Sequence, residues 1–124
     1  MNTSPFIIIG AVLAFFAVML GAFGAHALKS HLSTHYLTIY QIATDYQMWH
    51  AIGLIMIGIL HQQNPTHVLR KAGWFMFVGL LIFSGSLYAL SLTGVKALGA
   101  ITPFGGTALL IAWLLLAYNA FKSN

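Results

Sequence analysis

FSGSLYALSLTGVKALGAITPFGG, residues 83–106, decides the fold because it joins two long hydrophobic runs. The first run is expected to be a helix that ends at Gly94, since glycine readily adopts the left-handed conformation that commonly terminates helices. A short loop carrying Lys96 follows. Thr102 and Pro103 then predict a new helix, with Thr102 as N-cap and Pro103 in the first turn, where its missing N–H costs nothing. We expect the rest of the chain to pack as helices around this hairpin.

The composition predicts a protein surrounded by lipid. Of 124 residues, 60% are hydrophobic and 5% are charged, with five Lys or Arg and a single acid, Asp45. Soluble domains carry about a quarter charged residues. The net charge of +4 suggests basic loops that touch anionic headgroups. Five dispersed basic residues form no nucleic-acid-binding stripe, and the lack of cysteine excludes disulfides and thiolate sites.

Four apolar runs are each long enough to cross a hydrocarbon core of about 30 Å. They cover approximately residues 5–27, 42–61, 72–92 and 103–121. The first run imitates a signal peptide, with Ala25-His26-Ala27 as a cleavage-like site. It lacks a basic start, however, and exceeds the usual apolar length of about 7–15 residues. We therefore predict a retained span and one domain over residues 1–124.

The segment between the first two runs is more polar than the runs themselves. Residues 29–41 repeat Leu32, Tyr36 and Tyr40 at helical spacing, with histidines and threonines between them. This pattern is typical of an amphipathic helix in the membrane interface or of a polar extension of the next span. Pro65 closes the second run as a turn. The predicted fold class is an all-α integral membrane four-helix bundle with a short amphipathic segment between helices 1 and 2.

The basic residues predict an orientation. Four spans place both termini on one side, together with Arg70, Lys71 and Lys122, whereas Lys29 and Lys96 lie on the other side. Because basic residues are enriched in cytoplasmic loops, we predict a multi-pass protein of the cell (inner) membrane with both termini in the cytoplasm.

Small residues recur at spacings of three and four, as in Gly10, Ala14, Ala17 and Gly21 of the first run. Gly79 and Gly105 are comparable positions in the third and fourth runs. Small residues let helix backbones approach closely in lipid. These faces pack either within the chain or against a second copy or another membrane protein.

Alternating spans bring the main polar residues to one leaflet, which faces outward in the predicted orientation. We expect a polar ligand-binding pocket there, formed by His26, Asp45, Tyr46, Gln47, His50, Tyr88, Ser91 and Thr102.

His50 is the deepest of these residues, about 12 Å into its span at 1.5 Å per residue. Tyr46 and Gln47 precede it by one helical turn and so share its face. An ionisable side chain at that depth points into the bundle. His50 either contacts a ligand or proton, or is a neutral residue that bridges helices through Tyr88 or a backbone carbonyl. Asp45 is expected to form an ion pair with Lys29, Lys96 or a histidine.

Catalytic and metal sites are not predicted. One acid cannot provide the paired carboxylates of a glycosidase, and Ser84 and Ser86 have no visible activating partner. His31 and His35 have a metal-binding spacing but no further ligand in sequence reach. We expect no enzyme, no cofactor and no metal.

Four segments resemble the YgdD-like family of small bacterial inner-membrane proteins, which is a domain of unknown function: GAFGAHALK (21–29), YQMWHAIGL (46–54), AGWFMFVGLLIFSGSLYALSLTG (72–94) and LGAITPFGG (98–106). The resemblance implies a four-helix membrane protein and lends no activity. Its motifs direct attention to His26, Tyr46, Gln47, His50, Ser84, Tyr88, Thr102 and Pro103, and so add Ser84 to the candidate ligand-binding residues.

Three functions follow as hypotheses. The first is a non-enzymatic protein that binds, and in one version moves, a small or lipidic ligand or a proton. The second is a structural subunit or assembly partner of other membrane proteins. The third, an intramembrane enzyme, requires a reactive group that the sequence does not supply.

Overall fold

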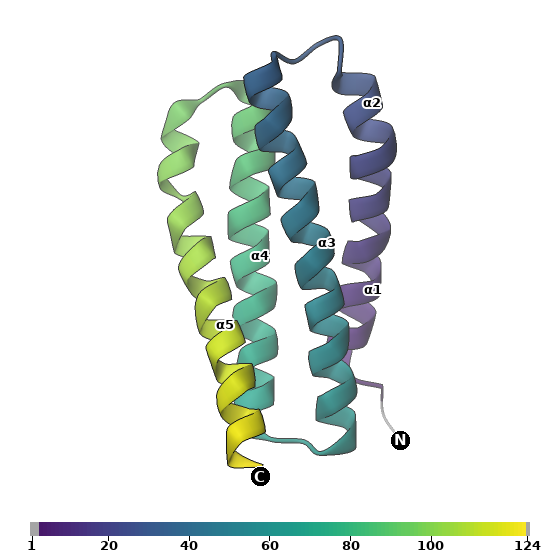
Figure 1. Cartoon of the computed structure of the whole chain (residues 1–124), viewed down its shortest axis with the longest axis vertical. Helices are drawn as coiled ribbons and strands as arrows, with labels where there is room; N and C mark the ends of the chain where they lie inside the picture. The colour runs from purple at the N-terminus through teal and green to yellow at the C-terminus, as the bar shows by residue number, and fades with distance from the viewer. Residues whose placement is uncertain (1–2, 124) are drawn as a thin grey trace.

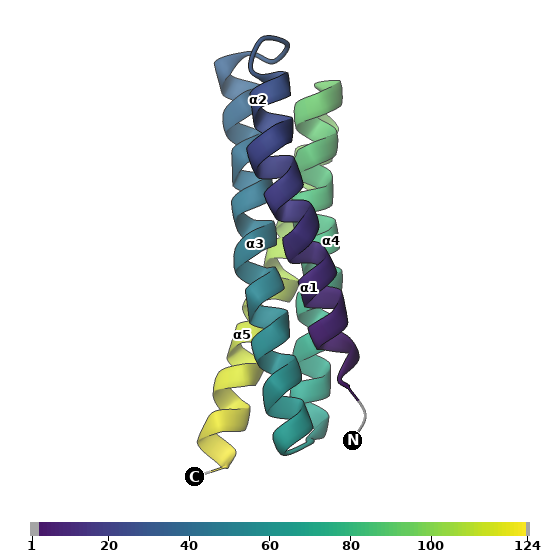
Figure 2. The same cartoon turned by 90° about the vertical axis from the view of Figure 1, so that its right-hand side faces the viewer.

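The computed structural model describes residues 3–123, and it is all-helical. Its long helices alternate in direction and lie side by side (Figure 1): α1 (Pro5–Val18), α3 (Thr34–Gln63), α4 (His67–Thr93) and α5 (Thr102–Lys122). Helix α3 packs against α1 and α4, and α5 packs against α4. Figure 2, seen from the α1 side, places α5 on the far side of the molecule. The turn between α3 and α4 lies at the same end as the start of α1 and the end of α5.

The first predicted span is one continuous helical segment, Pro5–Leu28. Helix α1 passes through a π-helical turn, Met19–Gly24, into the short helix α2, Ala25–Leu28. The Tyr40 hydroxyl donates a 2.6 Å hydrogen bond to the carbonyl of Leu20 within the π-helical turn. Helix α3 is thereby tied to the irregular part of the first span.

Helix α3 begins well before the predicted span 42–61. Ser33 caps its start, because the Ser33 hydroxyl accepts a 3.3 Å hydrogen bond from the Tyr36 N–H. The separate amphipathic segment is therefore wrong, and the alternative of a polar helical extension is correct. His31 precedes the helix, so His31 and His35 do not share a helix face as their spacing predicted.

The α4–α5 hairpin agrees with the prediction at one end and differs at the other. Gly94 ends α4 with φ of 72°, in the left-handed region. Thr102 is not the N-cap of α5, because it lies inside the helix and Ile101 precedes the first turn. The Thr102 hydroxyl lies 2.6 Å from Oγ of Ser86 on α4. Its hydrogen bond thus joins two helices, and the 3₁₀ turn Lys96–Ala100 leads into α5.

Among the described residues 3–123, three helical segments are long and apolar enough to cross a membrane: Pro5–Leu28, His67–Thr93 and Lys96–Lys122. The first, third and fourth predicted spans are thus confirmed as candidates by length and composition. Helix α3, with 30 residues, is longer than any of these. It is not a candidate on that test, because polar side chains such as Asp45, Gln47 and His50 lower the hydropathy of its first half.

Glycines allow close backbone contact at two helix crossings. Gly10 of α1 lies against the carbonyl of Ala51 on α3, and Gly105 of α5 lies against the backbone of Gly79 and Phe83 on α4. A side chain at either position would displace the partner backbone. These small residues therefore pack helices within the chain, as expected where lipid surrounds the helices.

The core lies between α3, α4, α5 and the first turn of α1. Its buried side chains are Phe6, Leu54, Ile57, Ala72, Met76, Leu80, Leu109 and Ala112. Many large apolar side chains point outward instead, including Phe15, Phe23, Leu110 and Leu114. Such extensive apolar exposure is unusual for a soluble monomer.

Candidate functional site

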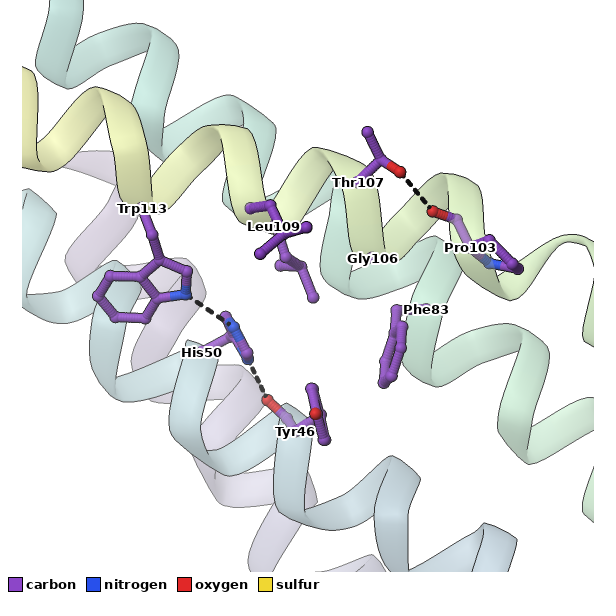
Figure 3. A pocket seen from close by; sticks show the side chains of 9 residues that line it. Tyr46, His50, Phe83, Pro103, Gly106, Thr107, Leu109 and Trp113 are labelled. Atoms are coloured by element: carbon purple, nitrogen blue, oxygen red, sulfur yellow. Dashed lines mark hydrogen bonds between the residues drawn. The ribbon is translucent and has the colours of Figure 1, made fainter.

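One polar contact joins the middle of α3 to the middle of α5. The indole Nε1–H of Trp113 donates a 3.0 Å hydrogen bond to Nε2 of His50. Nδ1 of His50 lies 2.8 Å from the backbone carbonyl of Tyr46, one turn earlier on α3. Figure 3 shows the imidazole between these two partners, with dashed lines marking both bonds.

These partners determine the protonation state of His50. The Trp113 indole can only donate, so Nε2 must accept and carries no proton. The Tyr46 carbonyl can only accept, so Nδ1 carries the proton. His50, which is 6% exposed, is therefore a neutral imidazole with both ring nitrogens satisfied. The structure supports the helix-bridging interpretation of His50, with Trp113 rather than Tyr88 as the side-chain partner.

A groove of about 450 Å³ opens beside this pair, between α3, α4 and α5. Three aromatic residues, Tyr46, Phe83 and Trp113, line it, and the centroids of the Tyr46 and Phe83 rings lie 4.5 Å apart. The remaining wall consists of His50, Pro103, Gly106, Thr107, Leu109 and Leu110. Pro103, Thr107 and Leu110 are exposed, so the groove is open to the outside of the helix array.

Gly53 and Gly106 make room in and beside this groove. The Trp113 ring packs over Gly53 of α3, where an added Cβ would be 3.1 Å from Cη2 of the indole. A Cβ on Gly106 would lie 3.6 Å from the Phe83 ring, which is ordinary van der Waals contact. Gly53 therefore allows Trp113 to pack closely on α3, and Gly106 leaves space in the groove wall beside Phe83.

A second polar cluster lies on the other side of α3, between α1 and α4. The Gln47 amide donates a 2.8 Å hydrogen bond to the carbonyl of Leu13 and accepts a 2.6 Å bond from the Tyr88 hydroxyl. The Tyr88 ring also packs edge-on against Tyr40, with centroids 5.4 Å apart. Gln47 thus links α1, α3 and α4 with both ends of its amide.

A cavity of about 120 Å³ adjoins this second cluster and is lined in part by Gln47, Ser84 and Tyr88. The Ser84 hydroxyl donates a 2.9 Å hydrogen bond to the carbonyl of Ala43. The Ser84 hydroxyl thus joins α4 to α3, as the Ser86–Thr102 bond joins α4 to α5.

The predicted pocket residues thus divide into separate groups. Tyr46 and His50 face α5, whereas Gln47, Ser84 and Tyr88 face the α1–α3–α4 side. Thr102 bonds to Ser86 on α4 and is not part of either cavity wall. His26 and Asp45 are exposed and also lie outside both walls.

Trp113 is the functional candidate that the sequence interpretation missed. It lies midway along an apolar run, where an aromatic side chain is expected only to pack against neighbouring helices or lipid. An indole N–H within lipid needs an acceptor, however, and a tryptophan at the depth of a histidine was the available signal. Phe83 and Thr107 carried no comparable signal.

The Thr107 hydroxyl and the His50 imidazole in the groove wall are engaged in structural hydrogen bonds. The Thr107 hydroxyl donates to the carbonyl of Pro103 at 2.8 Å, and both nitrogens of His50 are occupied. Within residues 3–123, His and Asp side chains form no group of three that could hold a metal ion. The arrangement is suited to holding a largely apolar molecule against aromatic rings.

Residues 20–106 match the model of a protein family described as "Protein of unknown function (DUF423)". This range contains all the segments that resembled a membrane family of unknown function. A UPF0382 membrane protein of Staphylococcus epidermidis is 50% identical over 117 residues, covering 94% of this chain and 95% of the relative. The corresponding protein of Staphylococcus saprophyticus is 48% identical over 117 residues, with 94% and 97% coverage. UPF0382 membrane protein YwdK of Bacillus subtilis is 45% identical over 118 residues, with 94% and 96% coverage. No solved structure matches the chain.

Proposed function

Because the chain belongs to the DUF423 family, and its relatives are named as membrane proteins, we propose that it is a multi-pass membrane protein that binds an apolar ligand from the bilayer. The ligand occupies the groove between α3, α4 and α5. The observation that carries this proposal is the 450 Å³ open groove lined by three aromatic rings. That volume lies within the range of small-molecule sites, which are concave and mostly apolar with a few polar groups.

In this proposal α3 is a fourth membrane span. It lies between α1 and α4, both of which belong to candidate spans, and therefore crosses the same bilayer as they do. The polar side chains Gln47 and His50 are 5% and 6% exposed. The outward face at the same depth carries Trp49, Ile52, Met56 and Ile59, which are between 45% and 56% exposed. A helix with this arrangement presents hydrocarbon to lipid although its mean hydropathy is low.

The proposed orientation follows from the ends of the helices. The turn between α3 and α4 lies at the same end as both chain ends, and Arg70, Lys71 and Lys122 belong to that end. Lys29 and Lys96 belong to the opposite end. The excess of basic residues favours a cytoplasmic location for the termini of an inner-membrane protein. The proposal includes membership of the YgdD-like family of inner-membrane proteins.

The groove indicates the chemistry of its ligand. Its open side faces the space that acyl chains occupy in a bilayer, so the ligand enters laterally and is lipidic or otherwise largely apolar. A ring or an unsaturated chain would stack between Tyr46 and Trp113. Stacking on aromatic rings gives a more favourable binding energy than contact with aliphatic side chains alone. Because the His50 nitrogens are satisfied, the imidazole acts as a wall and a positioning group for Trp113.

The proposal is for a non-enzymatic protein. Ser84, Ser86 and His50 each use their polar atoms to join helices or cap a backbone carbonyl. The alternative role as a structural subunit relied on small-residue faces, and Gly79 and Gly10 pack against neighbouring helices of the same chain. A homo-oligomer or a membrane-protein partner would therefore need a different surface.

Native mass spectrometry of the protein released gently from its own membrane tests the groove. Gly106→Leu extends a side chain past Phe83 into the groove, while its first carbon fits without displacement. Gly85→Leu is the matched control, because a Cβ there meets nothing within 4 Å and Gly85 is not part of the groove wall. We expect wild type and Gly85→Leu to carry a bound apolar molecule that Gly106→Leu lacks.

Two outcomes would contradict this function. If wild-type protein shows no bound molecule in native mass spectrometry, the groove has no ligand and the proposal is wrong. Equal loss from both glycine variants, with unchanged helical circular dichroism, would place the ligand outside the groove.

A further inference from the structure

A polar cleft lies at the end of the molecule opposite the loop between α4 and α5. It has a volume of about 350 Å³ and is formed around the turn that joins α3 to α4. Its walls are His61 at the end of α3, Pro65 and Thr66 in the turn, and His67 and Arg70 in the first turns of α4. One of these five residues is arginine, two are histidines and none is acidic.

The chain has no acidic side chain that could neutralise Arg70. Asp45 is the single acid in the sequence. Asp45 and His61 are 16 residues apart on α3, a separation of about 24 Å at 1.5 Å per residue. An exposed guanidinium at a membrane surface, without a carboxylate side chain of its own chain nearby, is an attractive site for an external anion.

The cleft lies at the depth of lipid headgroups. Arg70 belongs to the first turn of a candidate span, and the exposed Trp74 follows one turn later. Tryptophan is enriched at the boundary between headgroups and hydrocarbon. Trp74 is held there by an edge-on contact with Phe6, at 5.2 Å between ring centroids.

Helix α5 brings a further basic residue to this end. The Thr66 hydroxyl donates a 2.6 Å hydrogen bond to Oδ1 of Asn119, which holds the last turns of α5 beside the turn. Lys122 is three residues beyond Asn119 on that helix. The basic residues at this end of the molecule therefore come from two helices, although the Lys122 ammonium lies over the Tyr118 ring at 5.8 Å and outside the cleft wall.

A separate apolar groove begins one helical turn beyond Arg70 on α4. It has a volume of about 290 Å³ and is lined by Trp74, Phe75, Val78 and Ala108. Arg70, Trp74 and Val78 are spaced four residues apart on α4 and so follow one face of that helix. The basic cleft at Arg70 and the apolar groove thus follow one another along the axis of α4.

We propose that this face of α4 binds an anionic phospholipid, with its phosphate in the cleft and one acyl chain along the apolar groove. Arg70 binds the phosphate oxygens through its planar fork of N–H donors. A zwitterionic lipid also carries phosphate, but its ammonium group would enter a basic cleft whose walls contain no carboxylate. The site therefore discriminates by headgroup charge, and it is independent of the groove beside His50.

The test uses the full-length protein in detergent micelles and native mass spectrometry. Dioleoyl phosphatidylglycerol and dioleoyl phosphatidylcholine are added in equal amounts, so that only the headgroup differs. We expect wild type to retain the glycerol lipid about tenfold more than the choline lipid, the scale of one charge-assisted hydrogen-bonded contact. Arg70→Gln is expected to abolish this preference, and His67→Gln is expected to reduce it.

Lys96→Gln is the matched control, since it removes one exposed positive charge at the opposite end of the molecule. We expect it to keep the preference of wild type. If Arg70→Gln and Lys96→Gln lose retention equally, net charge and not the cleft selects the lipid, and the proposal is wrong.

Two further comparisons separate a lipid from free phosphate. If inorganic phosphate displaces the glycerol lipid, or if dihexanoyl and dioleoyl phosphatidylglycerol are retained equally, the apolar groove contributes nothing and the site is not a phospholipid site. Reduced retention of the dioleoyl lipid by Val78→Gln, with the dihexanoyl lipid unaffected, would support the acyl-chain position.

Discussion

The contact between Trp113 and His50 predicts a measurable coupling between the middle of α5 and the middle of α3. Trp113→Phe removes the indole donor and leaves Nε2 of His50 without a partner in a site where His50 is 6% exposed. An unsatisfied buried acceptor costs about 1–3 kcal/mol. Loss of the outer indole ring from its contact with Gly53 adds a packing cost to the same variant.

A double-mutant cycle separates the hydrogen bond from the packing. The four proteins are wild type, Trp113→Phe, His50→Leu and the double variant, and their unfolding free energies are measured by titration with sodium dodecyl sulfate in mixed micelles. Hydrogen bonds between membrane helices average about 0.6 kcal/mol with a maximum near 1.7 kcal/mol. We expect a coupling of about 1 kcal/mol, because both nitrogens of the imidazole are fixed by this geometry.

Trp49→Phe provides the matched control, since Trp49 lies on the same helix as His50 but is 56% exposed. Its effect is expected to stay within about 0.5 kcal/mol, as for most exposed substitutions. A coupling below about 0.3 kcal/mol, the usual error of additivity, would refute the neutral bridging histidine. So would a Trp113→Phe effect no larger than that of Trp49→Phe.

Two other perturbations follow from the helix contacts. Gln47→Leu leaves the Tyr88 hydroxyl without its acceptor and removes the bond to Leu13, so its unfolding free energy should fall by about 1–3 kcal/mol. Tyr88→Phe removes only one of these bonds and should cost less in the same titration; the reverse order would contradict the network. Gly105→Leu forces a side chain against the α4 backbone and should abolish the monodisperse, helical protein in size-exclusion chromatography, whereas Gly85→Leu should leave it intact.

The sequence predicted the helices more completely than their contacts. Long apolar runs and Gly94 were sufficient for the α4–α5 hairpin, because length and a left-handed terminator are local properties. The N-cap assignment of Thr102 was wrong because its hydroxyl bonds to Ser86 on another helix. A partner distant in sequence cannot be recognised from local capping preferences. The extension of α3 before residue 42 was one of two alternatives, and the capping residue Ser33 could have decided between them.

The candidate site could be predicted only as a set of residues. Tyr46, Gln47 and His50 follow each other within one turn of α3, and the sequence placed them together. In the structure His50 meets α5 whereas Gln47 meets α1 and α4. Gly10 packs α1 on α3, and Gly105 packs α5 on α4. Such contacts join residues distant in sequence, and hydrophobic periodicity does not encode them.

The π-helical turn Met19–Gly24 gives the first span two registers. A π-helical turn holds one residue more than the α-helical turn it replaces, so the faces of α1 and α2 are offset by one position. Gly10 meets α3 before the turn, and Gly24, the last residue of the turn, meets Tyr40. The chain can therefore lose one residue between 19 and 24 by converting this turn to regular helix, whereas one deletion elsewhere in the span would rotate a packed face away from α3. A related chain whose first span is one residue shorter is expected to lack that residue within this turn.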